Sequence, residues 1–188
     1  MKMDNRNRAP INWARLAAAV EFYQMRGYEY VEVPWAIDQE RLMATCPTED
    51  HVMKINGEDC LIGSAEQGFI TMGNLITERR YVSCSPCWRK EPVYDQIHHG
   101  TFMKVELYMP FNPTYADRYS ANKMLDDAMD FFKSQVQFTD WLSVVNTDQG
   151  QDIEYSGVEL GSYGVRTFGG IGWVYGTGLA EPRFSSVI

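Results

Sequence analysis

Long apolar runs and cysteines are both scarce in this chain of 188 residues, and each scarcity excludes a class of protein. No run of 18 or more apolar residues occurs, so the sequence predicts no membrane-spanning helix. The segment from Met1 to Pro10 is polar and lacks the apolar core of a secretory signal peptide. The cysteines are too few and too irregularly spaced for a disulfide scaffold, so we expect reduced thiols in a cytoplasmic protein: Cys46, Cys60, Cys84 and Cys87.

Positive charge is also in short supply. The formal net charge is −8, whereas a protein that binds a phosphate backbone over a wide surface usually presents a basic face. This balance argues against a nucleic-acid-binding module. Hydrophobic residues make up 45% of the chain, which suits one well-formed core. Because no linker, internal repeat or low-complexity stretch interrupts it, we expect a single domain over residues 1–188.

Apolar periodicity and turn residues predict that strands dominate the middle and the end of the chain. Helices are expected over residues 10–25, 39–45, 65–76 and 115–135. Strands are expected over residues 28–33, 52–55, 60–62, 81–89, 100–111, 141–145, 152–157, 158–161, 163–169 and 172–175, with a hairpin turn at 56–59. Since β-α-β alternation is rare, the pattern favours an α+β fold with an antiparallel sheet flanked by helices.

Two arginines beside predicted strands are candidates for phosphate binding. Arg89 ends a strand within Trp88-Arg89-Lys90-Glu91, and Arg183 follows Gly176-Thr177-Gly178-Leu179-Ala180. A guanidinium is permanently charged and matches phosphate oxygens with two parallel hydrogen bonds. Phe102 offers a ring on which a purine can stack, and the glycines would let backbone approach a ligand. The glycine pattern is neither a Walker loop nor a dinucleotide-binding fingerprint.

Taken in order, these segments resemble the signature motifs of class II aminoacyl-tRNA synthetases, and the seryl enzymes above all. The three motifs correspond to Gly27-Tyr28 to Pro34, to Trp88-Arg89-Lys90-Glu91 with the return strand Phe102 to Glu106, and to Gly176-Thr177-Gly178-Leu179-Ala180 with Arg183. Between them lie Ser64-Ala65-Glu66, Asp152-Ile153-Glu154, and the pair Glu159 and Ser162. Each of these short motifs is weak evidence alone, but their shared order makes the resemblance specific. The resemblance covers nearly the whole chain.

The resemblance implies ATP-dependent activation of an amino acid to an aminoacyl-adenylate, with a tRNA or a carrier protein as acceptor. It implies three catalytic residues, namely Arg89, Arg183 and Glu159. The implied ATP site consists of Arg89, Glu91, Phe102, Glu159, Ser162 and Arg183. Within it, Glu159 and Ser162 would hold Mg²⁺. The implied substrate pocket consists of Ser64, Glu66, Glu106, Trp173 and Tyr175, with Glu66 or Glu106 pairing the substrate ammonium group. A homodimer built through residues 10–34 is also implied.

Departures from the seryl pattern put serine and tRNA in doubt. Trp173 and Tyr175 stand where the family lines its serine pocket, Tyr175 in place of an asparagine, and Ser64 replaces a threonine. The loop from Glu91 to Phe102 is short. We find no segment that resembles the tRNA-binding arm or an anticodon domain, and the third motif's helix is nearly missing. The sequence therefore favours activation over tRNA charging.

Other interpretations remain beside this one. A non-catalytic paralogue that binds an amino acid or nucleotide and regulates a partner would share the motifs. Zinc is not expected, because a strand would point Cys84 and Cys87 to opposite faces. Cys46 and Glu66 could supply two zinc ligands, but no cysteine follows Cys87. His98-His99 is expected to line the entrance for ATP or the acceptor, or to be solvated.

Overall fold

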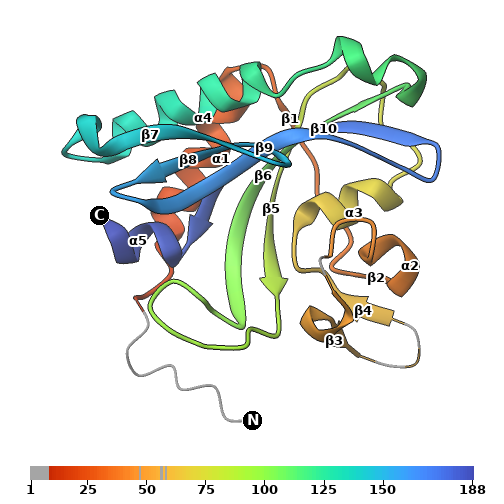
Figure 1. The fold of residues 1–188 in the computed structure, drawn as a ribbon, viewed down its shortest axis with the longest axis horizontal. Helices are drawn as coiled ribbons and strands as arrows, with labels where there is room; N and C mark the ends of the chain where they lie inside the picture. Colours follow the sequence, from red (N-terminus) through yellow and green to blue (C-terminus); the bar gives the residue numbers. More distant parts are fainter. Residues whose placement is uncertain (1–8, 47, 56, 58) are drawn as a thin grey trace.

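A computed structural model describes residues 9–46, 48–55, 57 and 59–188, and a seven-stranded sheet forms its centre (Figure 1). The strands lie in the order β1-β5-β6-β10-β9-β8-β7. β1 runs parallel to β5, and every other neighbouring pair is antiparallel. The strand bounds are β1 Glu29–Tyr30, β5 Tyr81–Trp88, β6 Thr101–Phe111, β7 Leu142–Thr147, β8 Gly150–Tyr155, β9 Val158–Phe168 and β10 Ile171–Glu181. The α+β fold with an antiparallel sheet is therefore confirmed.

Helices cover one face of this sheet and form the larger core with it. They are α1 (Trp13–Met25), α4 (Asn122–Gln135) and the short α5 (Arg183–Val187). In α1, Leu16, Ala19 and Tyr23 recur at helical spacing and are buried. The side chain of Asn12 caps the start of α1 by accepting from the backbone N–H of Arg15. None of the helices among the described residues is long and apolar enough to cross a membrane, and cytoplasmic location stays a prediction.

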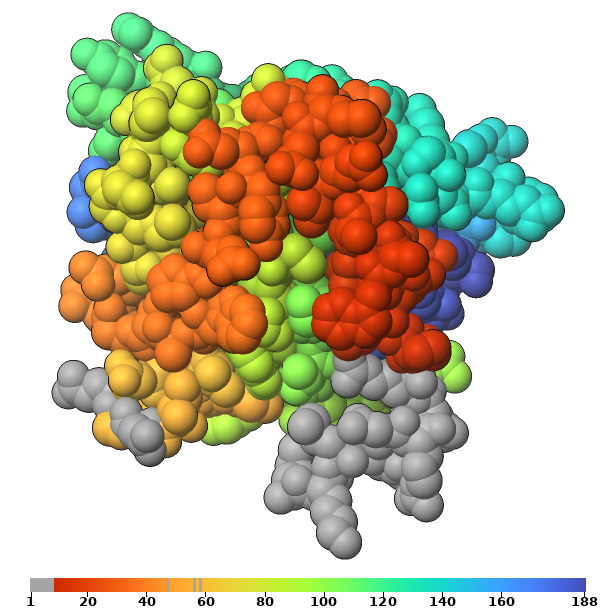
Figure 2. Space-filling model, turned by 180° about the vertical axis from the view of Figure 1, so that it is seen from behind, coloured from red at the N-terminus to blue at the C-terminus, as the bar shows by residue number. Residues whose placement is uncertain are grey.

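A small subdomain packs on the opposite face, over part of the sheet. It contains the three-stranded sheet β2-β4-β3 together with α2 and α3. The bounds are β2 Ala36–Asp38, α2 Gln39–Leu42, β3 Met53–Lys54, β4 Asp59–Leu61 and α3 Ala65–Thr71. In Figure 1 it lies beside the lower ends of β5 and β6, and Figure 2 shows from behind that the segment leading into it runs next to α1. The strand β2 was not predicted, and the predicted turn at 56–59 includes residues outside those described.

Several predicted boundaries were wrong, because tertiary pairing decided them. The expected helix 115–135 is split into η2 (Pro113–Arg118) and α4, and the helix at 65–76 ends at Thr71. The strand at 28–33 shortens to Glu29–Tyr30. Segments 158–161 and 163–169 form one strand, β9, and the strand at 172–175 continues to Glu181. Short 3-10 turns complete the chain at Glu49–His51 and Thr139–Trp141.

The glycines of the third motif make room for packing on the face of β10 away from the cleft, and their role in approaching a ligand stays a prediction. A Cβ atom on Gly178 would stand 2.6 Å from Cε2 of Tyr23, and one on Gly176 would stand 2.7 Å from Cδ1 of Tyr163. The hydroxyl of Tyr23 donates to the carbonyl of Gly178 at 3.0 Å. Between the glycines, Thr177 lines the opposite, open face. Gly178 therefore lets β10 lie close under α1, and Gly176 leaves room for the ring of Tyr163 on β9.

A buried carboxylate on α4 ties the exit of α1 to the edge of the sheet. Asp127 is 1% exposed and accepts from Arg26 Nη1 at 3.1 Å, from Lys123 Nζ at 2.5 Å and from Tyr28 Oη at 3.0 Å. Arg80 Nη1 lies 3.8 Å from its second oxygen. The charge of Asp127 is thus surrounded by three cations and a hydroxyl, which suits a buried carboxylate.

Candidate active site

A cleft of about 640 Å³ opens between the large sheet and the small subdomain, and a smaller cavity of about 50 Å³ adjoins it. Eight of the predicted site residues line the cleft: Ser64, Glu66, Arg89, Glu91, Glu106, Glu159, Ser162 and Tyr175. The smaller cavity shares Arg89, Glu91 and Glu159 and adds Phe102 and Arg183. Residues far apart in the sequence therefore meet at one place. Trp173 is the exception, because its side chain is fully buried beneath the cleft.

The antiparallel register brings these side chains together. Phe102, Lys104 and Glu106 alternate along β6, so they project from one face of the sheet. The next strand places Thr177 opposite Glu106. On β9, Glu159 and Ser162 are an odd number of residues apart, and both line the cleft because a register shift interrupts the β8–β9 pairing between them.

Two arginines line one end of the site. Arg89 donates from Nε to the carbonyl of Gly63 at 3.2 Å, and its guanidinium lies 5.4 Å from the ring centroid of Phe102. Both Nη groups of Arg89 lack a hydrogen-bond acceptor among the described residues. Arg183 is held by the carboxylate of Glu159, with Nη1 and Oε1 3.3 Å apart. This end therefore offers one uncommitted guanidinium and one that is weakly paired.

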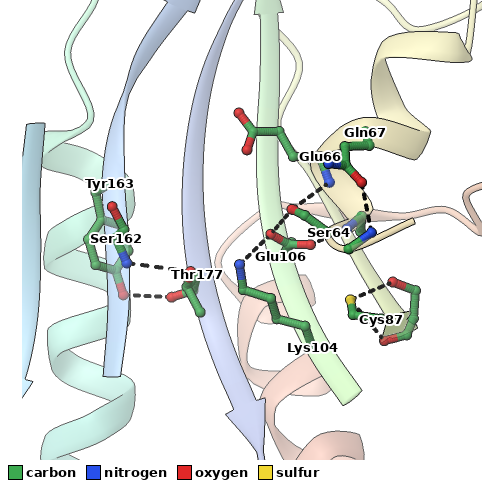
Figure 3. Close-up of polar contacts among 12 residues, drawn as sticks. Ser64, Glu66, Gln67, Cys87, Lys104, Glu106, Ser162, Tyr163 and Thr177 are labelled. Carbon is green, nitrogen blue, oxygen red and sulfur yellow. Dashed lines mark hydrogen bonds and ion pairs between the residues drawn. The ribbon is translucent and has the colours of Figure 1, made fainter. Parts of the chain in front are cut away.

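At the other end, Glu106 is fully occupied by the protein. Its carboxylate accepts from Ser64 Oγ at 2.5 Å, from Lys104 Nζ at 2.7 Å and from the backbone N–H of Ala65 (Figure 3). Ser64 also caps α3. The Ser64–Glu106 pair therefore fixes the first turn of α3 against β6, and its buried oxygens have protein donors without a substrate ammonium.

Glu66 is likewise occupied, by a residue that the sequence analysis missed. Arg166 Nη1 donates to both oxygens of Glu66 at 2.9 and 2.8 Å, and Trp173 Nε1 donates to Oε1 at 2.6 Å. Burial raises the pKa of Glu66, while the charge of Arg166 and the Trp173 hydrogen bond oppose the rise. The expectation that Trp173 lines the pocket was wrong: its indole lies underneath and holds Glu66.

Arg166 is itself fixed on three sides. Besides Glu66, it donates from Nη2 to Gln149 Oε1 at 2.9 Å, and its guanidinium stacks 4.1 Å from the ring centroid of Tyr175. A prediction of one continuous strand over 158–169 would have placed Arg166 on the same face as Ser162, since residues four apart on a strand share a face. Splitting that strand in two concealed this alternation.

The cysteines lie apart from one another. Cys84 packs against the helix-side core, whereas Cys87 is buried on the opposite face, as the strand alternation predicted. No disulfide joins the four cysteines, all of which lie within the described residues. Burial raises the pKa of the Cys84 thiol to about 11 and that of Cys87 to about 12. The predicted entrance residues also diverge: His98 is exposed and pairs with Asp95, while His99 lines the small cavity.

These differences predict selective thiol chemistry. At pH 8 a thiol-specific reagent is expected to modify Cys46, which lies half-buried on the cleft wall, at least about 100-fold faster than Cys87, because only the exposed thiolate reacts. Peptide mass mapping over time measures both rates, with Cys46→Ser as the control and urea-unfolded protein as the reference. Equal rates in the folded protein would contradict the buried position of Cys87.

Solved structures share this fold. No protein-family model and no curated protein sequence matches the chain. Seryl-tRNA synthetase from Pyrococcus horikoshii, complexed with ATP, is 19% identical with a TM-score of 0.74 over 93% of this chain and 49% of its own. A pyrrolysyl-tRNA synthetase from Desulfitobacterium hafniense is 16% identical with a TM-score of 0.68, covering 89% of this chain and 66% of its own.

The fold is that of a class II aminoacyl-tRNA synthetase catalytic core. The cytoplasmic serine-tRNA ligase of Naegleria fowleri, in complex with AMP, gives the same result at 16% identity and a TM-score of 0.67, over 93% of this chain and 48% of its own. The resemblance found in the motif order is thereby confirmed for the fold. The chain spans about half the length of the seryl structures that it matches.

Proposed function

We propose that the protein uses ATP to activate a carboxylic acid, in particular an amino acid, as an acyl-adenylate. One observation carries the proposal: the cleft and the smaller cavity adjoin, and Arg89, Glu91 and Glu159 line both. Phe102 and Arg183 belong to the smaller cavity. We assign this cavity, together with the adjoining part of the cleft, to the nucleotide. The wider cleft would hold the acid. Nucleotide complexes of the seryl neighbours, with ATP and with AMP, support this assignment.

The reaction needs no protein nucleophile. A carboxylate oxygen of the acid attacks the α-phosphorus and forms the acyl–phosphate bond. The bond from the α-phosphorus to the oxygen bridging to the β-phosphate breaks, and pyrophosphate leaves with that electron pair. Arg89 would stabilise the charge that develops at the α-phosphate, because its Nη groups are uncommitted and close to the ring of Phe102. The protein otherwise contributes positioning.

Mg²⁺ fits the residues near the phosphate end. The carboxylate of Glu159 and the hydroxyl of Ser162 line the cleft, and Mg²⁺ is commonly held by one or two carboxylates together with substrate phosphates. Over the described ranges, no group of three or more His, Cys, Asp or Glu is placed to hold a metal. Phosphate oxygens would therefore complete the coordination. When bound, the ion would neutralise phosphate charge.

Isotope exchange between pyrophosphate and ATP tests the proposal directly. In the presence of each of the twenty amino acids in turn, we expect exchange with a small subset and none without an acid, because the adenylate must form for label to return to ATP. If none of the amino acids supports exchange, the activation proposal is wrong. Omission of Mg²⁺ is expected to abolish the signal.

The remaining parts of the proposal concern the acceptor, the oligomeric state and the domain organisation. Transfer of the activated acid to a tRNA or to a carrier protein would follow activation. A homodimer through residues 10–34 is supported by large apolar side chains at the surface of this region, where Trp13 is 63% exposed and Met25 is 75% exposed. A single domain over 1–188 is supported by two cores that share one central sheet. Sedimentation equilibrium measures the oligomeric state.

A second candidate function is a non-catalytic paralogue that binds a ligand and regulates a partner. The engagement of Glu66 and Glu106 by protein donors favours it, since neither carboxylate awaits a substrate ammonium. Calorimetry separates the two functions, because a regulator binds ATP or an amino acid without producing pyrophosphate.

A further inference from the structure

Arg166 gives the acid end of the cleft a fixed set of hydrogen-bond donors. A guanidinium carries five N–H groups. Two of them go to Glu66 and one goes to Gln149, which leaves the Nε–H and one Nη2–H of Arg166 without an acceptor among the described residues. The side chain keeps a relative exposure of 25% and lines the cleft. Its unused donors are therefore accessible to a ligand there.

The contacts around Arg166 hold its plane in place. Glu66 is 8% exposed and is itself anchored by Trp173 from below. The ring of Tyr175 stacks on the guanidinium from another side. A planar donor group that is held before the ligand arrives is suited to a planar acceptor with two oxygens, because little conformational freedom is lost on binding.

Few of the carboxylates that line the cleft are free to bind an ammonium group at this end. Glu66 and Glu106 are saturated by Arg166 and Lys104 together with neutral donors. Glu91 and Glu159 also line the nucleotide cavity. Asp148 is the remaining carboxylate that lines the cleft, and it lies next to Gln149 in the chain. The Arg166 end therefore presents donors to a ligand, with one acidic side chain nearby.

We propose that the acid activated here carries a second carboxylate, which Arg166 binds, so that its substrates are dicarboxylic acids such as acidic amino acids. This inference rests on the proposed activation reaction. The reacting carboxylate lies at Arg89 and the second carboxylate accepts from the free N–H groups of Arg166. Asp148 faces the ammonium group when the substrate is an amino acid.

Matched pairs of substrates provide the test, since an acid and its amide differ in charge and hardly in shape. Pyrophosphate exchange is measured with aspartate against asparagine and with glutamate against glutamine, and succinate is added as an acid without an amine. We expect at least one acid to be preferred over its amide by about 100-fold or more in kcat/KM, because the amide presents an N–H₂ group to a donor.

Variants then assign the preference to Arg166. Arg166→Gln alone would leave Glu66 buried and unpaired, so the double variant Glu66→Gln with Arg166→Gln is used to keep the pair neutral. In this double variant, the ratio of kcat/KM for the acid to kcat/KM for its amide is expected to fall to about one. The KM for ATP and the thermal unfolding midpoint are expected to stay close to wild type. Lys133→Gln removes one exposed positive charge on α4 and should leave the ratio unchanged.

The outcomes separate this inference from the proposed function. Exchange supported only by neutral amino acids would overturn the role of Arg166 and leave activation standing. A double variant that folds, binds ATP and keeps the wild-type preference would also overturn it. If no acid supports pyrophosphate exchange, both the activation reaction and this inference are overturned. A preference for acids that the double variant abolishes supports both.

Discussion

Replacing Arg89 with methionine is expected to lower kcat/KM for acid-dependent pyrophosphate exchange by about 10³-fold. Arg89 and Lys104 are the cations that line both cavities, and Lys104 is already paired with Glu106 at 2.7 Å. Of these two cations, Arg89 is the one with an uncommitted charge at the place where the acid and the α-phosphate would meet in the proposed reaction. Methionine keeps most of the side-chain length and removes the charge. Initial rates across ATP and acid concentrations measure the effect.

Two matched variants control for structural damage at Arg89. Arg89→Lys keeps the positive charge but loses the planar fork, so it should recover only part of the rate. Arg79→Met removes an exposed arginine, whose partner is Glu29 at 2.8 Å on the surface, and should leave the rate unchanged. A folded Arg89→Met protein with wild-type exchange would show that the nucleotide binds elsewhere.

The fold was accessible from the sequence because its long strands and helices carry clear periodicity. In α1 the buried residues repeat every three to four positions, and the expected ranges of β5 and β6 nearly matched the observed strands. The order of weak motifs supplied the site residues. Those that lie on strands, such as Phe102, Glu106 and Tyr175, are placed once the strand face is known.

The details that were missed depend on contacts between distant segments. The strand β10 continues to Glu181 because β6 pairs with it on both sides of a register shift at Gly178, where Tyr23 of α1 packs closely. Local sequence does not reveal this pairing. Trp173 lies at a position that reads as pocket-lining, but its indole packs in the core and points its N–H at Glu66. Arg166 escaped notice because its carboxylate partner, Glu66, is 100 residues away in the chain.

At the acid end of the cleft, the contacts between distant segments change which hydrogen-bonding groups face a ligand. The motif resemblance implies Glu66 or Glu106 as the acceptor for an ammonium group. Three-dimensional packing surrounds both with protein donors, so that the accessible groups become the N–H donors of Arg166. The same backbone can therefore present the opposite hydrogen-bonding preference to a ligand. In the proposed reaction, this network rather than the motifs would select the acid.

Replacing Asp127 with asparagine is expected to reduce the free energy of unfolding by about 3 kcal/mol, the largest stability effect that we predict. The carboxylate is 1% exposed and serves Arg26, Lys123 and Tyr28. Asparagine keeps the shape but removes the negative charge, and its amide N–H₂ would face cations. Arg26 and Arg80, which are about one-third exposed, would lose their buried counter-charge. Urea denaturation followed by tryptophan fluorescence measures the change.

Asp130→Asn is the matched control for this change. Asp130 lies on the same helix, also pairs with Arg26, at 3.2 Å, and is 54% exposed. Because water screens an exposed pair, its loss is expected to change the free energy of unfolding by less than about 1 kcal/mol. Similar losses in the two variants would show that Asp127 acts as an ordinary surface charge. A large loss confined to Asp127→Asn supports the buried network as the anchor between α1, α4 and the sheet edge.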